Sequence, residues 1–496
     1  MSDLKLFWGD LHAHCGMSYG TGSLENALLN AREHLDFACV SGHAVWHDMT
    51  KENVPYQHII DYHQEAFDRL EKNWKNILLD ISKNSLKNKF IGIPGFEWHS
   101  MACGDYNVYY PKYEGKILRE TSLTELEEKV KAADGLMIPH HIAYIPGNRS
   151  IDWNNFPRER SPLAEIYSTH GCGEADDAPL PYYHTMGPRD YRNTARSGLA
   201  LGKKFGFIAS TDNHSGYPGS YGSGKMGVFA EELSMESLWE AFFKRRTITV
   251  TGDAVALKFS INNLFMGEEG SAAGTRLLHG TICGSDKIDL IEIIKNGRVV
   301  KVICPENKNR PSRKYKIRLE WGWGHEAEET KWNGSVKIDG GKLSGLEKCF
   351  GAEQSFILPK SERNEKEDVL IRHRVSSYSE SGFHLESLTR RNPHPRFSVT
   401  NSAVMEIEGN HATHFYFEMN GTKIISSLKE ILEGSRGWFT RGWVTPAFMV
   451  HKAVPENSYH INFEFEDQAE AETDYYYVRA RQANGHYAWS SPIWVK

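Results

Sequence analysis

The first half of the chain alternates short apolar runs with segments of helical periodicity. Apolar residues at positions 24, 27, 28 and 31 fall on one helical face, and Ser23 precedes them as a predicted N-cap. The same reasoning predicts helices over 24–34, 122–133, 190–202 and 234–244, and one or two helices over 56–83. It predicts strands over 6–11, 37–41, 90–96, 108–110, 136–139, 163–167 and 205–210. Strands that alternate with helices are typical of an α/β fold with a largely parallel sheet.

The pattern changes beyond residue 250, where helical periodicity is scarce. Apolar runs predict strands over 257–261, 288–294, 315–320, 398–407, 415–418 and 475–481, and only 425–432 has a helical pattern. Asn-Gly pairs at 296–297, 333–334, 420–421 and 484–485 are typical of hairpin turns. We therefore expect an α/β domain over residues 1–250 and a β-sandwich-like or jelly-roll-like accessory domain over 251–496.

Composition narrows the class of protein. The chain has 496 residues, a net charge of −6 and 40% hydrophobic residues, which is enough for two or three folded domains. The negative net charge argues against a protein that binds nucleic acid non-specifically. No apolar run approaches the roughly 20 residues of a membrane helix. The seven cysteines are scattered without a C-x-x-C pair, and the start of the sequence lacks the features of a signal peptide. We expect a cytoplasmic protein with a small-molecule substrate. The sequence leaves open whether the chain forms a homo-oligomer.

Polar residues follow the predicted strands of the first half. His12 and His14 are two residues apart, so a strand would place both side chains on one face. Each of six predicted strands ends in His, Asp or Glu. In an α/β barrel the carboxyl ends of the strands share one face, which carries the chemistry. Imidazoles and carboxylates that converge there suit a divalent transition metal.

These residues, in this order, resemble the motifs of the polymerase-and-histidinol-phosphatase (PHP) superfamily. The motifs are His12-x-His14, Ser41-Gly42-His43, Gly95-Phe96-Glu97, Pro139-His140, His170 and Asp212-Asn213-His214. Several segments, including the closing 475–478 and 488–494, are similar to a large PHP subfamily long catalogued as a domain of unknown function. The resemblance implies a distorted (β/α)7 barrel and metal-dependent hydrolysis, most often of phosphoesters.

The resemblance also implies a ligand set. One metal would be held by His12, His14, Glu97 and Asp212, and a second by Glu97, His140 and His170, with Glu97 as the bridge. A third position would use His43, His214 and a residue of the loop after His14. Two acidic residues of the family pattern are absent, because Ser18-Tyr19-Gly20 and Ser41-Gly42-His43 stand in their places. Phenol is a poor ligand at neutral pH. We therefore expect two ions of Zn, Mn or Fe, with the third position lacking its acid.

Two such ions would lower the pKa of a shared water and offset charge in the transition state. Besides Glu97, His43 and His214 are catalytic candidates, because an unligated histidine could protonate the leaving group. Substrate-binding candidates are Arg149 and Asn148 in the loop after His140, together with His99 and His141. A small phosphoester or phosphodiester is the expected substrate. Two alternatives remain. The first is metal-dependent hydrolysis of an amide, ester or glycoside-like bond, and the second is a degenerate barrel that acts as a binding module.

Overall fold

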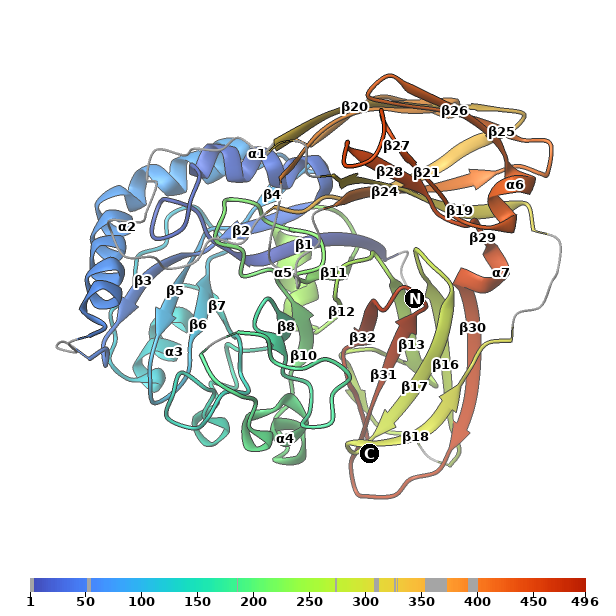
Figure 1. The fold of residues 1–496 in the computed structure, drawn as a ribbon. Coiled ribbons are helices and arrows are strands. Elements are labelled where there is room, and N and C mark those ends of the chain that lie inside the picture. The colour runs from blue at the N-terminus through green and yellow to red at the C-terminus, as the bar shows by residue number, and fades with distance from the viewer. Residues whose placement is uncertain are drawn as a thin grey trace.

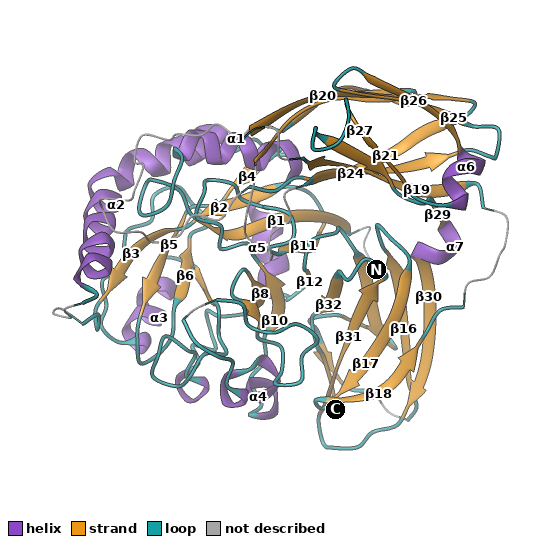
Figure 2. Ribbon diagram, viewed as in Figure 1, coloured by secondary structure: helices purple, strands orange, loops and turns teal. Residues whose placement is uncertain are grey.

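The computed structural model describes residues 4–50, 55–184, 186–272, 274–306, 312–324, 327, 329–352, 373–390 and 400–496. Positions 398 and 399 of the predicted strand 398–407 therefore lie outside the described residues. The N-terminal half is mixed α/β and the C-terminal half is rich in strands, with the longer helices along the outer side of the N-terminal half (Figures 1 and 2).

The helices of the N-terminal half follow the sequence pattern closely. They are α1 (Leu24–His34), α2 (Gln57–Asn84), α3 (Leu123–Ala132), α4 (Ala195–Ala200) and α5 (Met235–Phe243), with short 3-10 turns η1 (Trp153–Asn155) and η2 (Tyr191–Asn193). The predicted N-cap is confirmed, because the Ser23 side chain accepts a hydrogen bond from the Asn26 N–H. The helix expected over 190–202 is instead η2 and α4, because Thr194 is extended and caps a new helix.

Strand β1 lies between β11 and β2 in the largest sheet. The strands of this half are β1 (Lys5–Ala13), β2 (Phe37–Val40), β3 (Gly42–Trp46), β4 (Ile91–Gly92), β5 (Gly95–His99), β6 (Tyr106–Tyr109), β7 (Leu136–Pro139), β8 (Leu163–Ser168), β9 (Gly171–Cys172), β10 (Gly206–Ala209), β11 (Lys225–Ala230) and β12 (Thr247–Val250). Among the described residues they fall into three hydrogen-bonded sheets, ordered β12-β11-β1-β2-β4, β3-β5-β6-β7 and β10-β8-β9.

The expectation of a largely parallel sheet is wrong in part. Pairs β1–β2, β2–β4, β3–β5 and β8–β10 are parallel, but β1–β11, β11–β12, β5–β6 and β6–β7 are antiparallel. Only residues 100–105 join β5 to β6, too few for the crossover that a parallel pair needs.

Two strand predictions also change. The segment 90–96 splits into β4 and the start of β5 around Pro94, and residues 42–46 form β3, which the sequence pattern did not predict.

The C-terminal half contains 21 strands and two short helices among the described residues. They are β13 (Ala256–Ile261), β14 (Leu264–Phe265), β15 (Glu269–Gly270), β16 (Arg276–Cys283), β17 (Ile288–Lys295), β18 (Arg298–Ile303), β19 (Lys314–Trp323), β20 (Glu329–Asp339), β21 (Lys342–Cys349), β22 (Arg374–Ser379), β23 (Gly382–Arg390), β24 (Asn401–Glu408), β25 (His414–Met419), β26 (Thr422–Ser427), α6 (Leu428–Glu433), β27 (Arg436–Phe439), β28 (Ala447–Val450), β29 (Val454–Pro455), α7 (Glu456–Tyr459), β30 (His460–Asp467), β31 (Asp474–Gln482), β32 (Tyr487–Ser490) and β33 (Ile493–Val495).

Two of these sheets share one apolar core. The sheet β21-β24-β19-β28-β27 contributes Trp321 and Met405, and the sheet β22-β23-β20-β25-β26 contributes Val336 and Phe417. The last strands of the chain do something different, because β32 pairs with β12 and so extends the sheet of the N-terminal half. The predicted boundary at 250/251 follows β12 directly, and the division into two domains stays a prediction.

The Asn-Gly pairs divide into hairpin turns and one exception. Asn296-Gly297 and Asn420-Gly421 have positive φ at both residues and join β17 to β18 and β25 to β26, as expected. Gly485, also with positive φ, lies between β31 and β32. The turn predicted at 333–334 is wrong, because Gly334 lies inside β20 between its two partner strands. A Cβ at this position would come within 2.4 Å of Met419 Sδ.

The predicted helix 425–432 also begins later than expected. Ile425 belongs to β26, and α6 starts after Ser427, whose side chain forms a capping box with Glu430.

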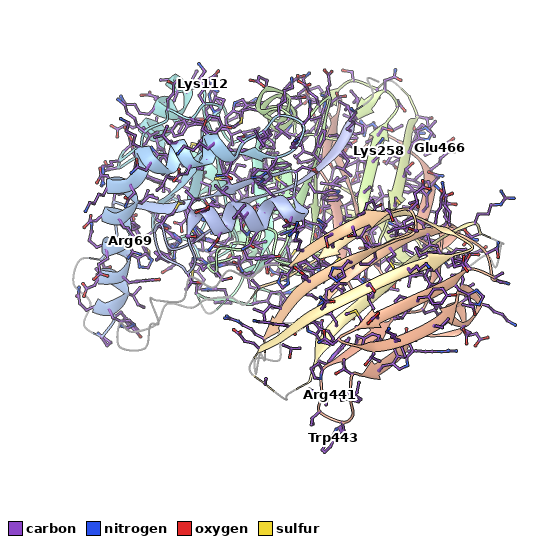
Figure 3. All side chains as sticks on the ribbon, turned by 90° about the horizontal axis from the view of Figure 1, so that it is seen from above. Arg69, Lys112, Lys258, Arg441, Trp443 and Glu466 are labelled. Carbon is purple, nitrogen blue, oxygen red and sulfur yellow. The ribbon has the colours of Figure 1, made fainter. Side chains whose placement is uncertain are left out.

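The surface carries charged side chains over both halves (Figure 3). The loop between β27 and β28 extends from the C-terminal half with Trp443 at its end, 85% exposed. None of the seven cysteines, all of which lie among the described residues, forms a disulfide bond. Across the described residues, none of the helices has the length and apolar character needed to cross a membrane.

Candidate metal centre

Six strands of the N-terminal half bring polar side chains to one buried place. His12 lies in β1 with His14 just after it, His43 lies in β3, and Glu97 and His99 lie in β5. His140 and His141 follow β7, His170 follows β8, and Asp212 and His214 follow β10. We call these ten residues the histidine–carboxylate cluster. Except for His214, whose side chain is 20% exposed, each is at most 5% exposed.

Two carboxylates hold the cluster together. Asp212 Oδ1 lies 3.2 Å from His12 Nε2 and 3.0 Å from His14 Nε2. Glu97 Oε2 lies 3.8 Å and 3.5 Å from the same two nitrogens. These four side chains, which the resemblance to PHP proteins implies as ligands of one metal, therefore face one another in the folded chain.

The other oxygens of the two carboxylates reach the remaining predicted ligands. Glu97 Oε1 lies 2.8 Å from His140 Nε2, while Asp212 Oδ2 lies 2.7 Å from His170 Nε2. Glu97 is thus within reach of both His12 and His140, as a bridging ligand must be. His170 approaches the cluster through Asp212, and its Nδ1 hydrogen-bonds the Tyr144 hydroxyl at 2.6 Å.

The residues expected at a third position also meet. His43 Nε2 lies 3.2 Å from His214 Nε2, and the Tyr19 ring stacks on His43 with centroids 3.6 Å apart. Tyr19 stands where the PHP motif pattern that the sequence resembles has an acid, and it is buried. Burial and the nearby Glu97 raise the pKa of the Tyr19 phenol well above its usual value, so it is not a ligand at neutral pH.

Several buried polar atoms of the cluster have no hydrogen-bond partner, which tests whether the residues fit a metal. They include His12 Nε2, His14 Nδ1, Glu97 Oε2 and His141 Nδ1. His12 Nδ1 donates to Glu165 Oε2 at 2.9 Å, so a neutral His12 has its lone pair on Nε2, facing the carboxylates. Acceptors that face one another in a dry interior are costly unless a cation lies between them. The donor set of imidazoles and carboxylates therefore fits a divalent ion.

Electrostatics gives the two carboxylates and His140 their metal-binding protonation state, whereas Asp212 and Glu165 outweigh burial and raise the pKa of His12. Burial opposes ionisation of Glu97, but the surrounding imidazoles of His43, His99 and His140 outweigh it and hold its pKa well below the usual range. The pKa of Asp212 is lowered in the same way, against burial, chiefly by His12. Burial lowers the pKa of His140, aided by His12. Ionised carboxylates and neutral imidazoles are the forms that bind metal.

The backbone is unusual at this place. His141, Arg149 and Asp212 have φ of 33°, 60° and 51°, a left-handed region that costs energy for residues other than glycine. Strain of this kind gathers at functional sites because the surroundings must impose it.

Two buried acids that sequence reasoning missed surround the cluster. Glu165 binds His12 from β8, and the signal that could have revealed it is a lone acid in an apolar strand. Asp105 Oδ2 lies 3.0 Å from His99 Nδ1 and 3.4 Å from His141 Nε2. It precedes β6, in a loop that no motif marks.

The four predicted substrate-binding residues lie in different surroundings from one another. Arg149 forms a salt bridge with Asp105, 2.5 Å from Nη2, and its guanidinium lies over the Trp46 ring. His99 and His141 lie in the cluster. Asn148 is exposed, and its amide donates to the Pro146 carbonyl 3.5 Å away.

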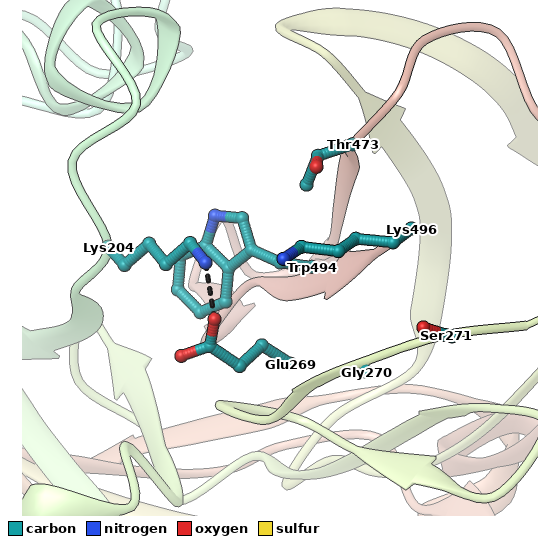
Figure 4. Close-up of a pocket in the computed structure, with 7 residues that line it drawn as sticks. All are labelled: Lys204, Glu269, Gly270, Ser271, Thr473, Trp494 and Lys496. Atoms are coloured by element: carbon teal, nitrogen blue, oxygen red, sulfur yellow. Dashed lines mark hydrogen bonds and ion pairs between the residues drawn. The ribbon is translucent and has the colours of Figure 1, made fainter.

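Two other places could be considered for ligands. Asp253, Glu347 and Cys349 could group around an ion, but Asp253 already accepts hydrogen bonds from Arg318, Tyr221, Gln482 and Asn484. A pocket of about 160 Å³ is lined by Lys204, Glu269, Gly270, Ser271, Thr473, Trp494 and Lys496 (Figure 4). Its Lys204 and Glu269 form an ion pair, and none of its lining residues belongs to the histidine–carboxylate cluster.

Comparison with known proteins gives distant relatives. No family model matches the chain. Uncharacterized proteins of Chlamydia muridarum and Chlamydia trachomatis are 26% and 25% identical over 333 residues, which is 61% of this chain and 50% of each relative. One of Chlamydia pneumoniae is 27% identical over 260 residues, 48% of this chain and 42% of that protein. The chain spans about half the length of the curated relatives it matches.

Two solved structures are also similar to the chain. One is a two-domain protein of Bacteroides vulgatus containing a predicted PHP-like metal-dependent phosphoesterase, 12% identical, covering 86% of this chain and 95% of that one, with a TM-score of 0.32. The other is PsfC from Pseudomonas syringae, 13% identical, covering 49% and 90%, with a TM-score of 0.31. Both TM-scores are low, so the function is inferred from the histidine–carboxylate cluster.

Proposed function

We propose that this protein is a metal-dependent hydrolase of the PHP type that uses a metal-activated water on a small phosphoester or phosphodiester. Residues 1–250 would form a distorted (β/α)7 barrel domain, residues 251–496 a separate β-sandwich-like or jelly-roll-like domain, and the protein would act in the cytoplasm. The observation that carries the proposal is Glu97, whose two oxygens reach His12 and His14 on one side and His140 on the other.

The residues divide into proposed roles. His12, His14, Glu97 and Asp212 would hold one ion, and Glu97, His140 and His170 a second. Zn, Mn or Fe at these positions would make hydroxide available at neutral pH and polarise the phosphoryl oxygen. Glu165 fixes the His12 ring through Nδ1, which keeps Nε2 directed at the two carboxylates.

Arg149 supports the choice of an anionic substrate. Its guanidinium is largely buried beside the cluster, and Nη1 donates to the Met186 sulfur at 3.5 Å, a weak acceptor that an anion would displace. The planar guanidinium fits phosphate oxygens, and the Asp105 salt bridge holds it in place.

His214 is the proposed proton-transfer residue, because it is the most exposed member of the cluster. Burial, together with His14, lowers the pKa of His214 to about 3, so it is neutral at pH 7. Its action as a general acid would therefore require the bound phosphate to raise that pKa.

Elemental analysis followed by a substrate panel tests the proposal. We expect stoichiometric Zn, Mn or Fe in the purified protein, and turnover of phosphoesters or phosphodiesters that His140→Gln abolishes. Absence of any stoichiometric metal would refute the metal-dependent mechanism. Turnover of amides, esters or glycosides with no phosphoester turnover would refute the substrate class but keep the metals.

A further inference from the structure

His99 lies in the cluster, although the ligand set implied by the family resemblance omits it. It follows Glu97 by two residues in β5, so both side chains leave the strand on the same face. His99 is fully buried, with Nε2 3.1 Å from His43 Nδ1. Two imidazole nitrogens this close either share a proton or share a cation.

The hydrogen bonds of His43 and His214 place the protons on one side of this contact. His214 Nδ1 lies 2.9 Å from the Asp212 carbonyl oxygen, which can only accept, so Nδ1 carries a proton. A neutral His214 then has its lone pair on Nε2, 3.2 Å from His43 Nε2. His43 must donate there through Nε2–H, which leaves the lone pair of His43 on Nδ1.

Asp105 fixes the proton of His99 in the same way. Its Oδ2 lies 3.0 Å from His99 Nδ1, and Glu97 Oε1 lies 3.3 Å from the same nitrogen. Arg149 Nη2 also lies 3.1 Å from Nδ1, but it has its own acceptor in Asp105 at 2.5 Å. Two carboxylate oxygens around Nδ1 favour a proton there, so the His99 lone pair is on Nε2.

Three acceptors therefore meet with no proton between them. His43 Nδ1, His99 Nε2 and Glu97 are close enough for their ligand atoms to lie within 4.8 Å of one another. Glu97 Oε2 lies 2.8 Å from His43 Nδ1 and has no hydrogen-bond partner, although it is buried. Lone pairs and a carboxylate at these distances repel one another unless a cation lies among them.

We propose that His99 is a metal ligand, which holds a divalent transition-metal ion together with His43 Nδ1 and Glu97 Oε2, while Asp105 orients the His99 ring. This inference rests on the proposed function, because it assumes a metal centre in the cluster. It differs from the third position implied by the family resemblance, because the ion lies on the Nδ1 side of His43 and not between His43 and His214. A neutral imidazole would thus do the work of the acid that Tyr19 replaces. Carboxylate–histidine–metal arrangements of this kind are common, and loss of the carboxylate costs about 10–100-fold in metal affinity.

The experiment compares metal binding by the whole chain in five forms: wild type, His99→Gln, Asp105→Asn, His140→Gln and His373→Gln. His373 is a matched control, since it is a buried histidine of the C-terminal half that hydrogen-bonds Ser387. Each protein is stripped with a chelator and titrated with Co²⁺. The number of bound ions comes from elemental analysis, and the ligand environment comes from the visible absorption of Co²⁺.

We expect His99→Gln to bind one ion fewer than wild type and to lose part of the cobalt absorption. Asp105→Asn should keep the number of ions but weaken one of them about 10–100-fold, and His373→Gln should match wild type. Unchanged binding and spectrum in His99→Gln would overturn the inference, because His99 and His43 would then share only a hydrogen bond.

If His99→Gln does not fold, judged by circular dichroism, Asp105→Asn decides, and unchanged affinity for every ion overturns the inference. Wild type without any stoichiometric ion would refute the proposed function itself. Wild type with two ions, of which His140→Gln loses one and His99→Gln loses none, would refute only the role of His99.

Discussion

Replacement of Asp253 by alanine should destabilise the contact between the two halves of the chain. Asp253 is fully buried just after β12. Its Oδ1 accepts from Arg318 Nη2 and from the Tyr221 hydroxyl, both at 2.7 Å. Its Oδ2 accepts from Gln482 at 2.8 Å and from Asn484 at 2.7 Å. One carboxylate therefore joins Tyr221 of the N-terminal half to strands β19 and β31 of the C-terminal half.

The cost of Asp253→Ala comes mainly from the charge left behind. Tyr221 can still pair with His486 Nε2 at 2.8 Å, but the Arg318 guanidinium, which is largely buried, loses its counter-charge. Removal of one partner from a buried ion pair costs about 3–5 kcal/mol. Replacement of both partners by apolar side chains avoids the uncompensated charge. The double variant Asp253→Ala, Arg318→Met should therefore cost less than the sum of the two single variants.

The effect should also depend on pH. Burial opposes the ionisation of Asp253, but Arg318 and His486 outweigh it and lower its pKa below the usual value. A carboxylate with a lowered pKa stabilises the folded state above its unfolded pKa of about 3.9, and this contribution is lost as the pH falls through the folded pKa. The difference between wild type and Asp253→Ala should be the same at pH 7 and pH 5, and it should shrink only at pH values below about 4.

Urea unfolding followed by circular dichroism measures these differences. Matched titrations of wild type, the two single variants and the double variant give the coupling energy between Asp253 and Arg318. The reasoning would be refuted if Asp253→Ala lowered the free energy of unfolding by less than about 1 kcal/mol, because a buried charge without a partner destabilises the folded state by more than that. It would also be refuted if the effects of the two single variants added up to the effect of the double variant.

Three further predictions concern the metal centre and the core. Glu165→Ala should weaken metal binding about 10–100-fold in competition with a chromophoric chelator, and unchanged affinity would remove Glu165 from the support of His12. Chelation of the metals should lower the melting temperature, since an ion at 100 times its Kd contributes about 2.7 kcal/mol, and an equal melting temperature would argue against binding to the folded cluster. Trp489→Ala should lower the free energy of unfolding by about 3–5 kcal/mol, because Trp489 of β32 is fully buried. The control Trp443→Ala, in the exposed loop, should change the free energy of unfolding by less than about 0.5 kcal/mol. Equal effects of the two substitutions would contradict the packing described for β32.

The elements that sequence reasoning predicted best are those set by local signals. Ser23 and the spacing of Ala27, Leu28 and Ala31 determine α1, because a cap and one apolar face lie within eleven residues. The pair His12 and His14 shares a face for an equally local reason, the two-residue period of a strand.

The elements predicted wrongly depend on partners far along the chain. Gly334 looks like a turn residue, but it lies inside β20 because β23 and β25 flank it closely on both sides. The β5–β6 pair is antiparallel because its loop is short, which an apolar pattern alone does not reveal.

The same limit applies to the candidate metal centre. Motif order identified the residues that strand ends bring together, but it contained no signal for Asp105 or Glu165, whose positions are fixed by tertiary contacts with His99 and His12. The proton positions follow from partners that are close in sequence, the Asp212 carbonyl for His214 and the Asp105 carboxylate for His99, but only the folded loops bring these atoms within hydrogen-bond distance.

The presence of Tyr19, where the motif pattern that this sequence resembles has an acid, therefore does not by itself exclude the proposed metal position. Tyr19 covers one face of His43 by stacking, while His99 approaches the Nδ1 edge of the same ring. The proposed position has no acid on the loop, but Glu97, whose pKa is held low by the surrounding imidazoles against burial, supplies a negative charge at the centre of the cluster. A motif identifies residues by their order, but a ligand is defined by a lone pair directed at a shared point. In this chain those directions, and not the motif alone, make His99 the residue to test.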